Sequence, residues 1–238
     1  MLTVDIHTHT VASGHGTQDT IADMAKEAAS RGIQILGISD HGPRTFCAGT
    51  PSYFRSLKFA QRQRFGVQML YGIELNILDG GSLDLEDSIL KELDYSIASM
   101  HKPPRRITTL EENTADYIKA MQNPYVRIIG HPDNTQFPVD YWRLVEAAAQ
   151  YHMIFELNEA SLKPGGYHQV AGTSTKENYM NLLSLCLPHR IPILLSSDTH
   201  GRQGLGKVDA CEAIIREAGY PEELIVNNHM ELLYKGKK

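Results

Sequence analysis

Short apolar stretches rich in β-branched residues recur along the chain and alternate with longer segments of helical periodicity. Apolar runs of this length are typical of buried strands. Strands that alternate with helices at this spacing indicate βα units and a parallel sheet. Seven strands are expected, at residues 3–7, 33–39, 67–73, 94–99, 126–130, 153–157 and 192–197.

Helical periodicity fills the segments between these strands. Thr20, with Asp23 three residues later, predicts a capping box at the start of the first helix, and Gly32 ends that helix. Pro51 is expected to open a helix that continues toward Gly66. Further helices are expected within residues 83–93, at 110–121, 139–151, 174–187 and 207–218, and in the tail through Leu232 and Leu233.

The composition is that of a soluble globular protein. Of the 238 residues, 42% are hydrophobic and 21% are charged. The formal net charge of −5 argues against a basic groove for nucleic acid, but it leaves room for a local cationic pocket. No linker or shift in composition divides the chain, so residues 1–238 are expected to form one domain.

Cysteine usage and the N-terminal segment bear on localisation. Cys47, Cys186 and Cys211 are scattered and form no CxxC pair, so neither a disulfide framework nor a thiolate zinc site is expected. His7 and His9 interrupt the segment where a signal peptide would have its apolar region. No apolar run approaches the length needed to cross a bilayer. We therefore expect a cytoplasmic protein.

Candidate metal-binding side chains follow the expected strands. In parallel α/β folds, chemistry gathers at the carboxyl ends of the strands. Imidazole and carboxylate are also the groups that hold catalytic divalent metals. One histidine at such a position would usually be a packing residue, but seven at successive strand ends are hard to ascribe to chance. The sequence thus indicates a metalloenzyme with nine candidate ligands: His7, His9, His15, His41, Glu74, His101, His131, Asp198 and His200.

The size of this set bears on the number of ions. A catalytic zinc takes roughly three protein ligands, so nine ligands supply about three metals. A hydroxide that bridges two ions is a strong nucleophile near neutral pH, and the same ions can clamp the oxygens of a phosphate group. Because the set contains no cysteine, zinc, manganese or iron is expected.

Two aspartates near the ligands are candidates for supporting roles. Asp5 shares the face of His7 and His9, one layer deeper in the strand. It could accept the proton of a ligand imidazole's second nitrogen, or it could be an ordinary polar turn residue. Asp40, beside His41, is assigned the same supporting role.

Further polar residues could line the pocket. Lys102 and Arg44, each close behind a candidate ligand, could pair with phosphate oxygens, although most such basic residues are merely solvated. Asn158 and Glu159 end the strand at 153–157 and could form hydrogen bonds at the pocket wall. His168, in the loop that follows, could touch substrate or simply decorate the loop.

These motifs closely resemble those of the PHP family (polymerase and histidinol phosphatase) along nearly the whole chain, with all nine ligand positions filled. Segments 11–13, 38–43, 72–77 and 147–149 are particularly similar to the YcdX-type phosphatase branch. The resemblance implies a distorted (β/α)7 TIM-like barrel with a trinuclear, usually zinc, centre at the carboxyl ends of its parallel strands. It also implies that a metal-bridging hydroxide attacks phosphorus without a dedicated protein nucleophile.

The resemblance further implies how the ligands divide among the ions, with Glu74 as a bridge between two of them. Residues 102–104 and 163–166 depart from the family pattern, so the identity of the substrate stays open. By the family pattern, one ion is held by His7, His9, Glu74 and Asp198, a second by Glu74, His101 and His131, and a third by His15, His41 and His200.

The favoured function is a metal-dependent phosphatase that acts on a small phosphorylated metabolite, with histidinol phosphatase as the nearest alternative. A PHP-type 3'-5' exonuclease or other nuclease is disfavoured by the acidic net charge and by the lack of an appended polymerase region. An amidohydrolase would also begin with a His-x-His motif, but it typically has a lysine where this chain has His101. The sequence names neither a general acid nor an oligomeric state.

Overall fold

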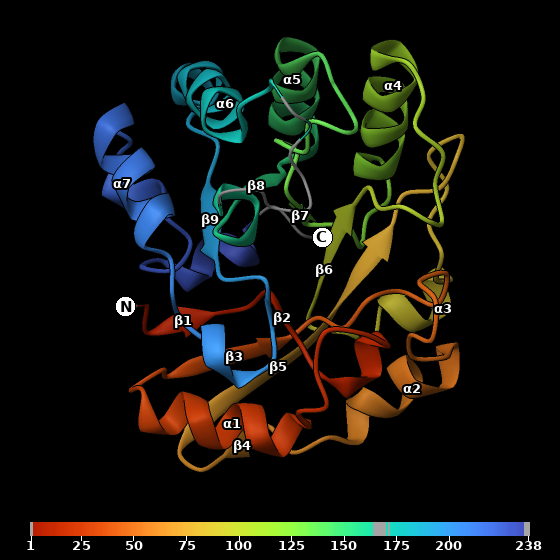
Figure 1. Ribbon diagram of the computed structural model, residues 1–238, viewed down its shortest axis with the longest axis vertical. Coiled ribbons are helices and arrows are strands. Elements are labelled where there is room, and N and C mark those ends of the chain that lie inside the picture. The colour runs from red at the N-terminus through yellow and green to blue at the C-terminus, as the bar shows by residue number, and fades with distance from the viewer. Residues whose placement is uncertain (1, 164–169, 171, 236–238) are drawn as a thin grey trace.

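Parallel strands form a sheet that curls almost into a closed barrel, with helices around the outside (Figure 1). The structure is a computed structural model and describes residues 2–163, 170 and 172–235. It confirms the expected distorted parallel barrel. Along the sheet the strands follow the order β1 (Val4–Asp5), β3 (Ile35–Ile38), β5 (Val67–Asn76), β6 (Tyr95–Ser99), β7 (Ile128–Ile129), β8 (Ile154–Asn158) and β9 (Ile193–Ser196).

The two end strands of this order, β1 and β9, are joined by the side chain of Asn227. Its Nδ2 donates hydrogen bonds to the carbonyls of Val4 (3.0 Å) and Leu195 (2.8 Å), and its Oδ1 accepts one from the Leu195 N–H (2.9 Å). The buried amide thus satisfies backbone groups along the seam between the two strands. Just beyond, β2 (Thr8–His9) and β10 (Thr199–His200) pair in parallel and complete the closure.

Asp5 belongs to the same seam. Its carboxylate accepts hydrogen bonds from the backbone N–H groups of Ser197 (3.3 Å) and Gly206 (2.9 Å). Burial raises the pKa of Asp5, and these hydrogen bonds act in the opposite direction. The sequence analysis offered Asp5 as an acceptor for a ligand imidazole. In the structure its hydrogen bonds instead join β1 to the segment that follows β9, because both of its oxygens face backbone donors there.

Alternating side chains fill the barrel interior. Leu70 and Glu74 lie on the same face of β5, and Ile154 and Glu156 lie on the same face of β8. In both rows the side chain is apolar near the start of the strand and polar near its carboxyl end, so the site sits directly above an apolar core. That core contains Val4, Ile6, Leu70, Tyr95, Ile97, Ile128, Ile154 and Leu194, with Val226, Leu232 and Leu233 from the tail.

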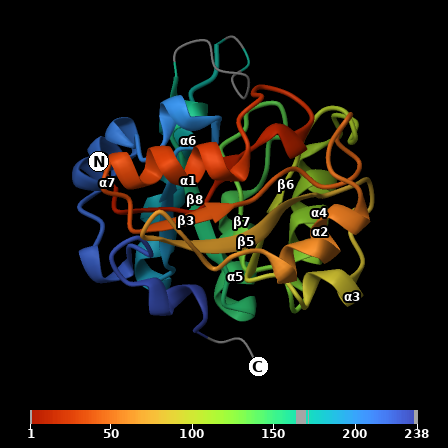
Figure 2. The same cartoon turned by 90° about the horizontal axis from the view of Figure 1, so that it is seen from below.

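Helices pack around the barrel, as Figure 2 shows from below, and a second and larger apolar core lies among them and the outward faces of the strands. The expected capping box is present: Asp23 N–H donates to Thr20 Oγ1, and the Thr20 N–H donates to the Asp23 carboxylate. In the described part of the chain, no helix is long and apolar enough to cross a membrane. The helices are α1 (Ile21–Ser30), α2 (Pro51–Ser56), α3 (Asp87–Leu90), α4 (Leu110–Met121), α5 (Tyr141–Tyr151), α6 (Thr175–His189) and α7 (Asp209–Ala218).

The helix expected from Pro51 toward Gly66 is shorter than predicted. After α2 the chain makes one 3-10 turn (Leu57–Phe59) and then enters β4 (Gln63–Arg64), which pairs antiparallel with β5. Phe65 (φ 51°) and Gly66 (φ 83°) form the two-residue turn between these strands. Two consecutive residues with positive φ favour a tight hairpin and cannot continue a helix.

The tail forms 3-10 turns (Glu222–Leu224 and Met230–Leu233) where a last helix was expected. The tail packs beneath the barrel as expected: Leu233 is fully buried in the interior core. The guanidinium of Arg127 donates to the carbonyls of Leu233 (2.8 Å) and Leu232 (2.7 Å). These bonds satisfy carbonyls at the end of the turn and hold the tail in place.

Replacing Asn227 by alanine is expected to lower the free energy of unfolding by about 3 kcal/mol, because buried backbone groups of both end strands would lose their partners. The neighbouring Asn228 is exposed, so Asn228→Ala should change this free energy by less than about 0.5 kcal/mol. Urea denaturation followed by circular dichroism measures both. Equal losses in the two variants would show that Asn227 does not hold the seam.

Candidate metal centre

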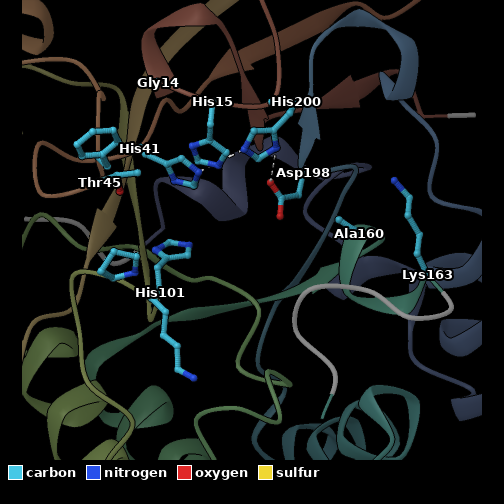
Figure 3. Close-up of a pocket in the computed structure, with 13 residues that line it drawn as sticks. Gly14, His15, His41, Thr45, His101, Ala160, Lys163, Asp198 and His200 are labelled. Carbon is cyan, nitrogen blue, oxygen red and sulfur yellow. Dashed lines mark hydrogen bonds and ion pairs between the residues drawn. The ribbon is translucent and has the colours of Figure 1, made fainter. Parts of the chain in front are cut away.

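The nine predicted ligands come together at the carboxyl ends of the strands. Glu74, in β5, is fully buried at the centre of the group. Five histidines approach its carboxylate, and Asp198, His200 and His15 contact these histidines in turn. Figure 3 shows His15, His41, His101, Asp198 and His200, which come from several segments of the chain and turn toward one space.

The Glu74 carboxylate contacts imidazoles through both of its oxygens. Oε1 lies 2.9 Å from His131 Nε2, 3.1 Å from His101 Nε2 and 3.4 Å from His7 Nε2. Oε2 lies 2.6 Å from His41 Nδ1. A carboxylate with ligand atoms on both sides is suited to bridge two cations.

Asp198, which follows β9, forms a second contact group with His7 and His9. Its Oδ1 lies 3.0 Å from His9 Nε2 and 3.6 Å from His7 Nε2. His9 Nε2 is also 3.6 Å from Glu74 Oε2. The amide of Asn158 donates to Asp198 Oδ2 (2.9 Å), which leaves Oδ1 facing the histidines. Asn158, expected at the pocket wall, therefore orients a candidate ligand.

A third contact group consists of His15, His41 and His200. The Nε2 atoms of His41 and His200 are 3.3 Å apart, and the ring centre of His15 lies 4.9 Å from that of His41 and 4.8 Å from that of His200. His200 also stacks on His9, with ring centres 4.2 Å apart, because β10 pairs with β2. Two imidazole nitrogens this close need a proton or a cation between them.

Buried polar atoms test whether this cluster fits a metal. Nε2 of His7, Nε2 of His9 and Oδ1 of Asp198 are buried and approach one another without hydrogen-bonding geometry. Buried polar groups without partners are costly, so converging lone pairs of this kind fit shared cations. Among the residues that the structure describes, three overlapping sets have ligand atoms within 4.8 Å of one another: His7, His9 and Asp198; His9, His41 and His200; and His41, Glu74 and His101.

Glu156, in β8, is a functional candidate that the sequence analysis missed. One of its oxygens contacts His7 Nδ1 and the Ser196 hydroxyl, and the other accepts a hydrogen bond from the His131 N–H (2.8 Å). An acceptor at Nδ1 keeps the imidazole proton there and leaves the Nε2 lone pair for a metal. A glutamate inside an otherwise apolar strand is the signal that could have identified it.

Ser13 plays the equivalent part for His9. The Ser13 Oγ donates to Asp40 Oδ1 (2.7 Å) and lies 2.9 Å from His9 Nδ1. Because the hydroxyl proton is used on Asp40, the serine oxygen accepts the His9 Nδ1–H. Tyr53 donates to the other Asp40 oxygen (2.6 Å). Asp40 thus reaches a candidate ligand through one intermediate side chain.

Asn76 orients His101 in the same way. His101 Nδ1 lies 2.9 Å from Asn76 Oδ1. The Asn76 amide nitrogen donates to Asp84 Oδ2 (2.6 Å) and to Thr45 Oγ1 (3.1 Å), which fixes the direction of the amide. Asn76 Oδ1 therefore accepts the His101 Nδ1 proton, which turns Nε2 toward Glu74 and the cluster.

The electrostatics of the cluster favour cation binding. Burial alone would raise the pKa of Glu74, but the neighbouring histidines outweigh it and hold that pKa well below its ordinary value. Burial, together with the charge of His200, lowers the pKa of His9 to about 3, so this imidazole is neutral. Burial opposes protonation of His131, yet Glu74 raises its pKa to about 9. A cation bound there would displace a proton.

Two candidate ligands have a strained backbone. His131 (φ 27°) and Asp198 (φ 47°) have positive φ values that side chains disfavour. Each comes two residues after a strand, β7 or β9, where the chain turns out of the barrel. Strain of roughly 1–3 kcal/mol persists only where the surroundings enforce it, and it concentrates at functional sites.

The cluster opens into a cavity of about 620 Å³. Lys102, predicted to contact phosphate, lines this cavity. Arg44 is not among the described residues that line it: its side chain is exposed, and its N–H donates to Asp84 Oδ2 (3.0 Å). The lining consists of Gly14, His15, Gly16, His41, Thr45, Phe46, His101, Lys102, Pro103, Ala160, Lys163, Asp198 and His200.

Glu159 and His168 were also predicted to line the pocket, and the structure places only Glu159. Glu159 accepts hydrogen bonds from the N–H groups of Ala210 (3.1 Å) and Cys211 (3.1 Å), so it caps the start of α7. A carboxylate at a helix N-terminus is favoured by the helix dipole, which accounts for this position. His168 lies outside the described residues.

Comparisons with known proteins bear on the family to which the chain belongs. The PHP domain model matches residues 5–183. The chain belongs to the PHP family. A probable phosphatase of Clostridium novyi (strain NT) is 39% identical over 225 residues, which are 94% of this chain and 89% of that protein. A probable phosphatase of Clostridium botulinum (strain Hall) is 36% identical over 233 residues, or 98% and 93% of the two chains.

A solved structure shares the PHP fold. The crystal structure of histidinol phosphate phosphatase from Lactococcus lactis, complexed with zinc, L-histidinol and phosphate, has a TM-score of 0.60 at 16% identity. The match covers 92% of this chain and 94% of that one. The family resemblance drawn from the motifs is confirmed.

Glu156→Gln is expected to weaken zinc binding roughly 10- to 100-fold, because it removes the charged acceptor beside His7 Nδ1. The matched control is Glu159→Gln. Glu159 directly follows β8, and its carboxylate caps α7 rather than contacting the cluster. Competition with a chromogenic chelator measures both affinities. Equal zinc affinity in the two variants would show that Glu156 does not support metal binding.

Proposed function

We propose that this PHP protein is a metal-dependent phosphatase that hydrolyses small phosphate monoesters at a centre of three divalent ions. The observation that carries the proposal is the buried Glu74 carboxylate, which faces five imidazoles beside an open cavity. Relatives named as probable phosphatases support the reaction class. Imidazole and carboxylate donors suit zinc, which we take as the first choice, and the same donors also suit manganese and iron.

The ligands would divide among the ions by the family pattern. When bound, the ions would supply a hydroxide nucleophile near neutral pH and neutralise charge on the phosphoryl oxygens. Glu156, Ser13 and Asn76 fix the imidazoles that would hold them. His7, His9, Glu74 and Asp198 would hold one ion, Glu74, His101 and His131 a second, and His15, His41 and His200 a third.

The cavity supports a small substrate. Its volume of about 620 Å³ is that of a metabolite-sized ligand site. Lys102 adds a positive charge in the lining, where it would attract a phosphate group. The net charge of −5 offers no general attraction for a nucleic-acid backbone. Histidinol phosphate is one small ester of this kind, so histidinol phosphatase remains the alternative.

Purified protein is expected to contain about three divalent ions per chain, following the ratio of roughly three ligands per ion. It should release phosphate from several small monoesters, lose this activity with a chelator and regain it with zinc or manganese. Elemental analysis and a phosphate-release assay measure these properties. The panel should include histidinol phosphate and a single-stranded oligonucleotide.

The outcomes of this panel separate the alternatives. Activity confined to histidinol phosphate would favour the narrower phosphatase, and faster cleavage of the oligonucleotide would favour a nuclease. One ion per chain would contradict the trinuclear centre without contradicting phosphatase activity.

Lys102→Ala is expected to raise KM for a small monoester roughly three- to tenfold with less effect on kcat, because an exposed charge on the rim contributes mainly to binding. Arg44→Ala is the matched control, since Arg44 also follows a candidate ligand but lies outside the described lining. Steady-state kinetics measure both variants. A larger increase in KM for Arg44→Ala than for Lys102→Ala would indicate that Arg44, and not Lys102, contacts the phosphate group.

A further inference from the structure

An exposed aromatic side chain lines the cavity. Phe46 lies five residues after His41, in the loop between β3 and α2, and 82% of it is accessible. No large hydrophobic residue in the described part of the chain is more exposed. Phe59 is nearly as exposed (81%), but among the described residues Phe46 is the only phenylalanine that lines the cavity, so its place beside the candidate metal ligands is what suggests a role.

The backbone holds Phe46 at the tip of a tight turn. The Ala48 N–H donates to the Thr45 carbonyl (3.1 Å), which places Phe46 and Cys47 at the two central positions. Cys47 has a φ of 61°, a conformation that glycine or asparagine usually supplies at the second central position of a type II turn. The exposure of Phe46 is therefore imposed by the fold at some cost in strain.

Neighbouring segments fix this turn from both sides. The Gly49 N–H donates to the Ala12 carbonyl (2.7 Å), and Thr45 Oγ1 accepts from the Asn76 amide (3.1 Å). A Cβ at Gly14 would lie 2.4 Å from the Cys47 carbonyl carbon, so only glycine allows this approach. The turn is thus packed against the segment that contains Ala12, Gly14 and His15 and against the end of β5, which carries Glu74, and it presents the ring as a preformed surface.

We propose that Phe46 stacks on a planar aromatic group in the alcohol portion of the substrate. This inference rests on the proposed function: the phosphate would lie at the metal ligands, and the alcohol portion would extend along the cavity lining past Phe46. Pro103 and Ala160 supply further apolar lining, as a planar ring requires. The substrate class is therefore an aromatic or heteroaromatic phosphate monoester.

The test compares two esters whose leaving alcohols have similar acidity, 2-phenylethyl phosphate and n-butyl phosphate. The wild-type protein should prefer the phenyl ester in kcat/KM. Phe46→Ala should reduce this preference roughly five- to tenfold, the value of one aromatic stacking contact. Phe46→Tyr should retain the preference. The matched control is Phe59→Ala, which removes an equally exposed ring (81%) that is not among the described cavity residues.

Binding of the corresponding phosphonates, measured by calorimetry on the zinc-loaded protein, separates this inference from the proposed function. If no phosphate ester of the panel described above were hydrolysed, while the protein bound 2-phenylethylphosphonate with a Phe46-dependent preference, the phosphatase would be refuted and the aromatic site supported. Equal binding of the phenyl and butyl phosphonates to the wild-type protein would refute the aromatic site whatever the rate of hydrolysis. So would an equal loss of preference in Phe46→Ala and Phe59→Ala.

Discussion

The buried carboxylate of Glu74 is the constraint on which the rest of this structure depends. A carboxylate without access to water is stable only if its charge is compensated, and here five imidazoles surround it. These imidazoles follow strands on both sides of β5, so the strand ends must stay aligned to within a few ångströms. The curvature of the sheet provides this alignment, and the apolar interior beneath Glu74 supports it.

Closure of the barrel brings together candidate ligands from the two ends of the chain. The β2–β10 register pairs His9 with His200, although the two residues are far apart in the sequence. Asp5 and Asn227 bind backbone groups along the adjoining seam. These two polar residues make no hydrogen bond to a candidate ligand side chain. The position of Asp198 relative to His7 and His9 nevertheless depends on the closure that they stabilise.

The sequence was informative wherever a local pattern determined the structure. Seven apolar runs predicted the strands, and the ligands could be found because each follows one of those runs. Partners that depend on strand order were missed. Glu156 reaches His7 because the strand order carries β8 and β9 around to β1, and Asp5 faces a seam whose donors lie about 190 residues later in the chain. Neither contact can be predicted from the spacing of residues along a single strand.

In the proposed phosphatase, one side chain would connect metal ligation with substrate recognition. The strands hold the ligands, whereas the loops after β3, β6 and β8 contribute most of the remaining cavity lining. The Asn76 amide connects a candidate metal ligand with the cavity lining. Its oxygen orients His101, and its nitrogen donates to Thr45 in the turn that presents Phe46. A change in the turn that displaced Thr45 would remove one of the hydrogen bonds that fix this amide and leave the bond to Asp84. In the proposed enzyme, a change of the Phe46 side chain would therefore disturb the candidate ligands least, and a change of the backbone that supports it would disturb them most.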